Sequence, residues 1–386
     1  MSGVAIAGVA ESDLGQVAPG LTPVDLMAQA SLRALDECGL TTADVDGLFA
    51  ASTQLPMATL NLGEYLRIEP RYTDATQIGG SSFEAHVDHA RAAIGAGLCE
   101  VALIAYGSTQ RTVGRSRTSV QEIDPYEAPY RPVLPVAAYA LAASRHMHEF
   151  GTTREQLAAV AVAAREWARM NPKAWSRDPL TVEDVLAAPM VCDPLGVRDC
   201  CLVTDGGAAA VVVSAERASE LPKPPVHVLG CGEAHDHRHI SSMRSLTRTA
   251  AVESGRRAFA EAGLTPGDVD VAQLYDAFTI TPVLFLEDLG FCPKGEGGPF
   301  VADGNVGPGG RLPMNTNGGG LSYCHPGMYG LLALVEAVRQ VRGECGERQV
   351  PDCHVAVAHG NGGVLSSQAT VLLGAEAARS ARRVRH

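Results

Sequence analysis

Three features that would assign a function directly are missing from this sequence. No apolar stretch approaches the ~20 residues that a transmembrane helix needs, so we expect no membrane span. None of the ten cysteines belongs to a Cys-x-x-Cys pair, and the spacing typical of a structural zinc site is absent. Positive charge is in deficit, with 31 Lys and Arg against 43 Asp and Glu and a net charge of −12. We therefore expect no metal in this chain and no nucleic-acid partner.

The sequence also predicts neither a secretory leader nor a disulfide framework. The apolar start, Val4 to Ala10, has no basic residues before it and meets Glu11 at once, which is unlike a signal peptide. The cysteines show only the vicinal pair Cys200-Cys201, which rarely forms a useful bridge. We expect reduced thiols and a cytoplasmic location. Apolar residues make up 46% of the 386 residues, enough for a large core.

The chain repeats one plan in two places. Ala34 to Leu48 reads ALDECGLTTADVDGL, and Ala258 to Ala272 reads AFAEAGLTPGDVDVA, with eight of fifteen positions identical. Downstream, Gly79-Gly-Ser-Ser82 and Gly319-Gly-Leu-Ser322 each precede a helical stretch and then an apolar strand. Such an echo indicates a duplicated α/β domain. We expect two similar halves with a site between them.

The boundary between the halves is predicted at a proline-rich link, Leu221 to Pro225. We assign residues 1–225 to the first half and 226–386 to the second. Residues 110–200 of the first half contain an irregular start rich in Arg, Ser and Pro, followed by two helical stretches. We interpret this region as an insertion.

Polar groups gather in three glycine-rich loops of the second half. These are Tyr275-Asp276 at the end of a strand, Asn317 to Gly330, and His359 to Gly363. Strand ends are where α/β proteins place ligands. Glycines let backbone N–H groups approach a developing negative charge. The counterpart in the first half is Gln77 to Ser82.

These loops resemble those of a known family. The strand end Leu274-Tyr-Asp-Ala-Phe278 and the Gly-Gly-x-x-Ser-x-x-His-Pro loop ending at Pro326 look like the second half of a thiolase, most of all the sterol-carrier-protein or lipid-transfer type. The resemblance covers nearly the whole chain. It implies an α/β thiolase-like fold, with two duplicated halves stacked as five layers (α-β-α-β-α) around a dimeric core. It also implies an acyl-CoA thioester as substrate.

The departures from the thiolase pattern change the expected chemistry. Thiolases carry a nucleophilic Cys at the start of the buried helix after the first-half glycine loop, a position that falls on Gly80 or Ser81. No cysteine occurs between Cys38 and Cys99. The position of the second thiolase Cys holds His359 and that of the family's Asn/His holds Tyr275, whereas the His-Pro histidine is retained as His325.

Without a thiolate the chain lacks the usual acyl acceptor. A site that binds a thioester and stabilises its enolate can instead perform retro-aldol cleavage. The loop is most similar to that of the actinobacterial thiolase-like aldolases of steroid side-chain degradation. This resemblance implies cleavage of a 17-hydroxy steroid side-chain CoA thioester to propionyl-CoA and a 17-ketosteroid. It also implies a small partner protein made of a zinc ribbon and an OB-fold, which forms a heterotetramer with this chain. This chain itself is expected to hold no cofactor, and any zinc would belong to the partner.

Five residues are candidates for proton transfer. Tyr275 is the first, although an unshifted tyrosine, with a pKa of about 10, is only ~0.1% ionised at neutral pH. Tyr323 and Tyr329 flank His325, and either one could be the second acid or base. A neutral His325 could donate to the thioester oxygen. His359 is either catalytic or a residue that fixes its turn.

The expected substrate contacts come from the same loops and from one basic stretch. Ser81 and Ser82 are interpreted as helix caps or oxyanion donors. Arg244 and Arg248 could meet the CoA phosphates or simply belong to a solvated helix. The other expected contacts are Gly80, Asp276, Asn317, Gly319, Asn361 and Gly362.

Two other functions remain open. One is a true thiolase-type acyltransferase that uses Ser81 or a distant Cys. The other is a non-catalytic subunit that binds acyl-CoA or lipid. Titratable groups clustered in one cleft favour an enzyme.

Overall fold

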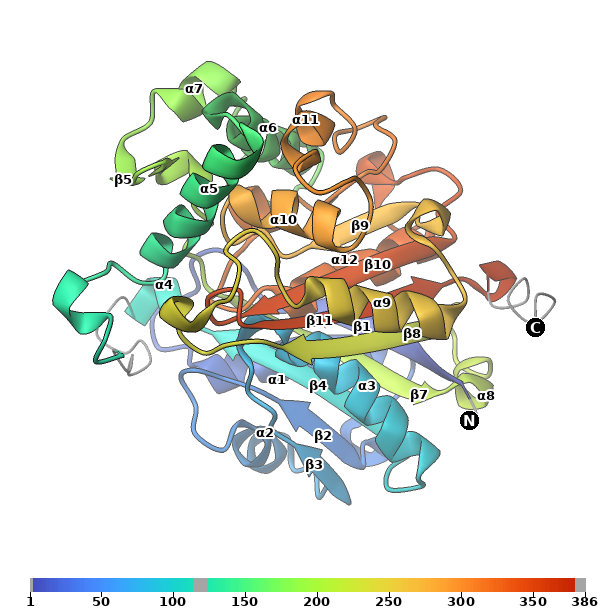
Figure 1. Cartoon of the computed structure of the whole chain (residues 1–386). Coiled ribbons are helices and arrows are strands. Elements are labelled where there is room, and N and C mark those ends of the chain that lie inside the picture. Colours follow the sequence, from blue (N-terminus) through green and yellow to red (C-terminus); the bar gives the residue numbers. More distant parts are fainter. Residues whose placement is uncertain (1–2, 114–123, 379–386) are drawn as a thin grey trace.

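The computed structural model describes residues 3–113 and 124–378 (Figure 1). Its strands are β1 (Val4–Glu11), β2 (Gly47–Ala50), β3 (Tyr72–Asp74), β4 (Val101–Ser108), β5 (Met190–Cys192), β6 (Leu195–Gly196), β7 (Gly206–Ser214), β8 (Val226–His235), β9 (Val271–Leu274), β10 (Val355–Gly362) and β11 (Ser367–Gly374). Its helices are α1 (Pro23–Glu37), α2 (Ala58–Leu66), α3 (Ser82–Gly95), α4 (Gln110–Val113), α5 (Val136–Phe150), α6 (Arg154–Arg169), α7 (Val182–Leu186), α8 (Ala215–Ala218), α9 (Ala251–Ala262), α10 (Ile280–Asp288), α11 (Gly297–Ala302) and α12 (Gly330–Arg342).

The duplication predicted from the repeat is visible in the strand order. The main sheet runs β3-β2-β4-β7-β1-β8-β11-β10-β9. The first half contributes β3-β2-β4-β7-β1 and the second β9-β10-β11-β8. Apart from the edge strand β3, the two halves therefore have the same order read toward the centre. The two sets join where β1 pairs antiparallel with β8, at Ala5 with His227 and Ile6 with Val226.

Helices complete the expected layers. Helix α1 packs on β1, β4 and β7, and α9 packs on β8 and β11. Helices α3 and α12 both contact strands of the two halves and therefore form the central layer (Figure 1). The α/β five-layer prediction is confirmed, with the addition that one sheet is continuous through both halves.

Local sequence explains the repeated turns. Thr41 and Asp44 bond reciprocally at the start of a short 3-10 turn in the first half, with Thr41 N–H donating to the Asp44 carboxylate at 2.8 Å. Thr265 and Asp268 do the same in the second half, also at 2.8 Å. These capping boxes account for the Gly-Leu-Thr and Asp-Val-Asp echo, because Thr and Asp at this spacing satisfy backbone donors.

The insertion holds α5, α6 and α7 (Figure 1). Helix α6 begins with a capping box between Thr153 and Gln156 and packs on α11 and on the turn at Gly319–Tyr323. The insertion therefore covers the second half, although it belongs to the first in sequence. In the described parts of the chain, no helix combines the length and apolarity needed to cross a membrane.

Candidate active site

A cavity of about 610 Å³ lies where loops from the two halves meet. Gly80 reaches it from the first half, and Tyr275, His325 and Asn361 reach it from the second. Four of the candidates named from the sequence therefore share one cavity. Its apolar wall is formed by Ile78, Leu134, Pro135, Ala277, Phe278, Met328 and Val364.

Tyr275 and His325 form a direct pair. The Tyr275 hydroxyl lies 3.1 Å from His325 Nε2, and the two rings meet edge to face with centroids 5.6 Å apart. The backbone N–H of Tyr329 donates to the Tyr275 oxygen at 3.2 Å. Because that oxygen already accepts a hydrogen bond, the hydroxyl proton can be donated to His325 Nε2 or to the Gly327 carbonyl oxygen, 3.5 Å away.

Burial fixes the charge state of this pair. It raises the pKa of Tyr275 well above its usual value and lowers the pKa of His325 to about 4. At neutral pH both groups are therefore uncharged. A tyrosinate base would need the opposite shift. With the His325 ring protonated on Nδ1, the Tyr275 hydroxyl is the proton donor in the resting site and His325 Nε2 is the acceptor.

Gly80 makes room for the Tyr275 ring. A Cβ placed on Gly80 would lie 2.1 Å from Cε2 of Tyr275 and 2.7 Å from the carbonyl oxygen of Asn361. Both distances are far below van der Waals contact, so no side chain fits there while the ring stays in place. A cysteine at position 80 would therefore clash with the Tyr275 ring.

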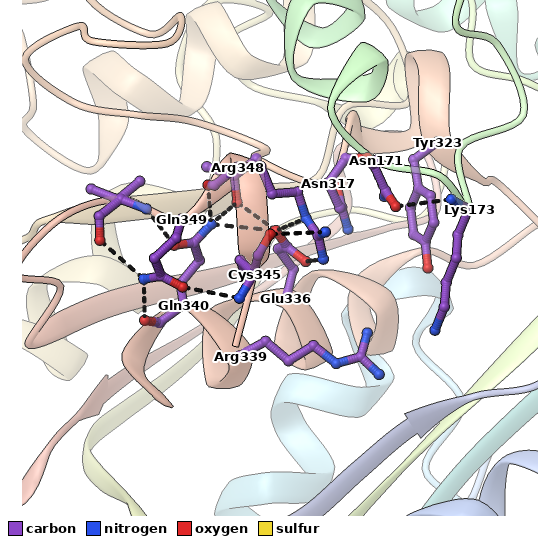
Figure 2. Close-up of polar contacts among 12 residues, drawn as sticks. Asn171, Lys173, Asn317, Tyr323, Glu336, Arg339, Gln340, Cys345, Arg348 and Gln349 are labelled. Carbon is purple, nitrogen blue, oxygen red and sulfur yellow. Dashed lines mark hydrogen bonds and ion pairs between the residues drawn. The ribbon is translucent and has the colours of Figure 1, made fainter. Parts of the chain in front are cut away.

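Tyr323 lies elsewhere, contrary to the expectation that it could reach the reacting atoms. Its hydroxyl donates to Glu11 Oε1 at 2.8 Å, and Glu11 also pairs with Arg339 and Lys173. Figure 2 shows Tyr323 beside Lys173, with Arg339 extending toward them. Arg339, together with Lys173 and the Tyr323 hydrogen bond, outweighs burial and holds the pKa of Glu11 well below its usual range. Tyr323 therefore belongs to a buried ion network. It is the last residue of the Gly319–Tyr323 turn, and it is not among the described residues that line the cavity.

Tyr329 contributes its backbone rather than its hydroxyl. The hydroxyl donates to Asn317 Oδ1 at 2.8 Å, and Asn317 Oδ1 also accepts from the Gly319 N–H at 2.8 Å. Neither Tyr329 nor Asn317 is among the described residues that line the cavity. Both fix the turn that carries His325, which corrects their expected roles as acid and substrate contact.

His359 stands behind the cavity wall and holds Asn361. His359 Nε2 lies 3.0 Å from Gln368 Oε1, Gln368 Nε2 donates to Asn361 Oδ1 at 2.8 Å, and Asn361 Nδ2 donates to the Tyr139 hydroxyl at 2.9 Å. Burial lowers the pKa of His359 to about 3. His359 is therefore a neutral residue that positions Asn361 through Gln368, and Asn361 and Tyr139 are the residues of this hydrogen-bonded set that line the cavity.

Asp276 supports the same turn as Asn317. Its Oδ1 accepts from the Gly320 N–H at 2.6 Å and its Oδ2 from the Leu321 N–H at 3.2 Å. A Cβ on Gly319 would lie 2.0 Å from Asp276 Oδ2, and Gly319 has φ +63°. Only glycine allows this approach at that backbone angle. Asp276 and Gly319 shape the loop and do not line the cavity themselves.

The serines of the first-half loop are bonded within the protein. Ser82 Oγ donates to the Gly79 carbonyl at 2.7 Å and accepts from the Ile78 N–H at 3.0 Å. Ser81 Oγ lies 2.8 Å from Ser367 Oγ. Gly362 lies against this loop, because a Cβ there would meet the Ile78 carbonyl at 1.7 Å. Ser82 and Gly362 are thus structural.

The basic residues at the cavity differ from those expected. Arg244 and Arg248 are exposed and are not among the described lining residues. Arg238, which follows β8, lines the cavity together with His235, His237 and His239. The sequence reads His-Asp-His-Arg-His from 235 to 239, a histidine cluster that was not among the predicted substrate contacts.

One cysteine also lines the cavity. Cys201, half of the vicinal pair, reaches it, and its N–H donates to the Ala277 carbonyl at 2.9 Å. Removal from water raises the pKa of the Cys201 thiol, so it stays protonated and is a weak nucleophile. Its sequence position, more than 100 residues from the glycine loop, gave no sign of this placement.

Comparisons with known proteins agree with this fold. Residues 232–375 match the family described as "Thiolase C-terminal domain-like". An acetyl-CoA acetyltransferase of Methanothermobacter thermautotrophicus is 34% identical over 383 residues, covering 94% of this chain and 97% of its own. A 17-hydroxy-3-oxo-4-pregnene-20-carboxyl-CoA lyase of Mycobacterium tuberculosis is 35% identical over 382 residues, covering 93% and 96%.

A solved structure titled "Ltp2-ChsH2(DUF35) aldolase" superposes with a TM-score of 0.87 at 33% identity, covering 97% of this chain and 98% of that one. The acetyltransferase and the lyase are about equally similar in sequence, so identity alone does not choose between acyl transfer and cleavage. With relatives of this identity over more than nine-tenths of its length, the chain belongs to the thiolase superfamily.

Proposed function

We propose that this protein is a lyase that cleaves a β-hydroxyacyl-CoA by retro-aldol chemistry. The observation that carries the proposal is the Tyr275 ring against Gly80, hydrogen-bonded to a neutral His325. This arrangement supplies a proton relay where an acyl-transfer enzyme of the family needs a thiolate.

The relay works without an exposed tyrosinate. As the substrate's β-hydroxyl proton moves to the Tyr275 oxygen, the phenolic proton moves to His325 Nε2. The bond between the α- and β-carbons then breaks, leaving a ketone and a thioester enolate. Tyr275 then passes a proton to the α-carbon and regains one from His325 Nε2, so the net result is transfer of the β-hydroxyl proton to the acyl-CoA product, and no water is consumed. The imidazolium formed in between stabilises the nearby enolate.

The cavity supports a bulky alicyclic substrate. Its volume of about 610 Å³ lies within the ~300–1,000 Å³ common for small-molecule sites, and its wall is largely apolar. Together with the names of the aldolase and lyase relatives, this favours a 17-hydroxy steroid side-chain CoA thioester. The products would then be propionyl-CoA and a 17-ketosteroid.

A partner subunit follows from the same comparison. The matched aldolase structure is titled as a complex with a second component. We propose that this chain forms a homodimeric core and binds a small OB-fold and zinc-ribbon protein as a heterotetramer. Light scattering on the chain alone and with that partner should give a dimer and then a complex of two copies of each.

The direct experiment mixes the purified chain, with and without the partner, with a 17-hydroxy steroid short-chain CoA ester. Propionyl-CoA and a ketone appearing in equal amounts are the expected products. Acetyl-CoA formed only when free CoA is added would indicate acyl transfer instead.

The pH dependence should reflect the low pKa of His325. Below its pKa of about 4, Nε2 carries a proton and cannot accept one from Tyr275. We therefore expect kcat/KM to be level through neutral pH and to fall only as the pH drops through about 4, since this parameter reports the free enzyme. An acid limb near 6.5, the value of an ordinary histidine, would contradict the assignment. Circular dichroism at each pH separates this limb from acid unfolding.

Acyl transfer through Cys201 is the alternative that one observation favours, because this thiol reaches the cavity. The raised pKa argues against it. Cys201→Ser should keep the cleavage rate within about twofold of the parent, since serine fills nearly the same space. Iodoacetamide should have the same effect on the variant as on the parent. Loss of activity in Cys201→Ser with a folded protein would favour the thiol route.

A further inference from the structure

Ser367, His235 and Glu233 form a hydrogen-bonded series that begins at a wall of the cavity. Ser367 Oγ lies 3.0 Å from His235 Nδ1, and His235 Nε2 lies 2.6 Å from Glu233 Oε1. Ser367 on β11 is paired in register with His235 on β8, so the two side chains extend from the same face of neighbouring strands. Ser367 and His235 both line the cavity that holds Tyr275.

The hydrogen bonds allow Ser367 to donate its proton to His235. The Ser81 hydroxyl donates its single proton to the Ile78 carbonyl at 3.1 Å, so its oxygen faces Ser367 Oγ, 2.8 Å away, as an acceptor. Ser367 therefore has one proton and two acceptors within reach, Ser81 Oγ and His235 Nδ1. When His235 carries its proton on Nε2 and donates it to the Glu233 carboxylate, Nδ1 is the base for the Ser367 proton.

Glu233 is held ionised by a second histidine. His89 Nε2 lies 3.4 Å from Glu233 Oε2, and His89 Nδ1 lies 2.7 Å from Asp74 Oδ2. The hydrogen bond to Asp74 raises the pKa of His89 to about 10, so this imidazole is cationic at neutral pH. The bond from His89 in turn lowers the pKa of Glu233. A fixed carboxylate orients His235 and stabilises the cation that it becomes on taking a proton.

The serine also lies beside a positive helix end. Its neighbour Ser81 is the N-cap of α3, a helix of 14 residues. The N-terminal dipole of such a helix favours negative charge that develops on a nearby oxygen. A nucleophile, a base, an orienting carboxylate and a favourable field are thus gathered on one wall, apart from the Tyr275–His325 pair.

We propose that Ser367 is the nucleophile of a second activity, the hydrolysis of acyl-CoA thioesters that have no β-hydroxyl to cleave. Ser367 Oγ bonds to the thioester carbon as His235 takes the serine proton. The carbon–sulfur bond breaks, and CoA leaves as a thiol with that proton. Water then attacks the serine ester with His235 as base, releasing a carboxylic acid and restoring Ser367. The inference rests on the proposed function in one respect, that acyl-CoA enters this cavity.

The test uses propionyl-CoA, which cannot undergo retro-aldol cleavage. Propionate and CoA are followed by chromatography for the full-length protein against a buffer blank. Ser367→Ala and His235→Gln should each lower hydrolysis by roughly 100-fold or more, and the double variant should be no worse than either, because members of such a unit are not additive. Ser219→Ala, an exposed serine that bonds only to the Glu216 carbonyl, serves as the matched control and should match the parent.

A covalent readout separates this role from a structural one. Peptide mass spectrometry of acid-quenched enzyme should find propionyl on Ser367, and Ser367→Cys should carry it as a thioester that neutral hydroxylamine removes. Parent hydrolysis no faster than the blank, or Ser367→Ala as fast as the parent, would overturn the proposal. Ketone release from a β-hydroxyacyl-CoA is measured on the same samples. Loss of that release alone would refute the lyase and leave the serine site standing.

Discussion

Replacing Tyr275 with phenylalanine lowers kcat for retro-aldol cleavage by about 10²–10⁴-fold, the usual contribution of positioned proton transfer. The hydroxyl is the only part removed. It lies 3.1 Å from His325 Nε2, and in the proposed relay it passes the proton of the substrate's β-hydroxyl to that nitrogen. The ring stays against Gly80, so KM should change little. Steady-state kinetics with a 17-hydroxy steroid CoA ester gives both parameters.

The matched control is Tyr323→Phe, which removes an equally buried hydroxyl from the Glu11 network. This change should cost about 1.5–3 kcal/mol of stability, typical of a hydrogen bond to a charged group, and leave kcat within about twofold. If Tyr323→Phe loses turnover and Tyr275→Phe does not, the roles of the two tyrosines are reversed.

Gly80→Ala should nearly abolish cleavage and destabilise the fold. The added methyl would lie 2.1 Å from Cε2 of Tyr275, so the ring must leave its position beside His325. Overpacking of this kind costs about 1–3 kcal/mol, and we expect kcat to fall by about 100-fold or more because the relay is broken. Thermal melts and the same kinetic assay measure both effects.

Gly95→Ala, at the other end of helix α3, is the control for alanine at a glycine. A Cβ there meets nothing within 4 Å, so stability should hold or rise by up to about 1 kcal/mol. Pairing Gly80→Ala with Tyr275→Ala should recover much of the lost stability without recovering activity. A stable, active Gly80→Ala would show that the ring does not need this space.

The fold was predictable because short stretches of sequence, such as the repeated fifteen-residue segment, determine its helices, turns and strands. The fifteen-residue echo reproduces a helix, a capping box and a strand in each half. The matching strand orders follow from that repetition. The continuity of the sheet was not predictable, since the β1–β8 pairing rests on two residue pairs, Ala5 with His227 and Ile6 with Val226.

The site was predictable only in part. Tyr275 and His325 end up together because they follow a strand end and lie in a retained His-Pro loop. Tyr323 lies two residues from His325 and still points into an ion network, since the turn before it sets the direction of each side chain. Sequence spacing cannot give that direction.

Contacts between residues on different strands could not be predicted from the sequence either. Ser367 and His235 are 132 residues apart and meet only through the register of β8 and β11. Cys201 reaches the cavity through a backbone bond to Ala277. Such pairs become visible only when the pairing of strands and loops is known.

The unbroken sheet has a consequence for how substrate arrives. Hinge motion between the halves would have to tear hydrogen bonds from the middle of a nine-stranded sheet, because β1 and β8 join them there. We therefore expect no hinge opening between the two halves of the kind seen in clam-shell enzymes. Access to Tyr275 must instead depend on side chains and connecting segments around the rim, such as Arg238 and the residues that precede α5. Turnover should then be limited by local rearrangement of those residues, while the two halves stay fixed relative to each other as one rigid body.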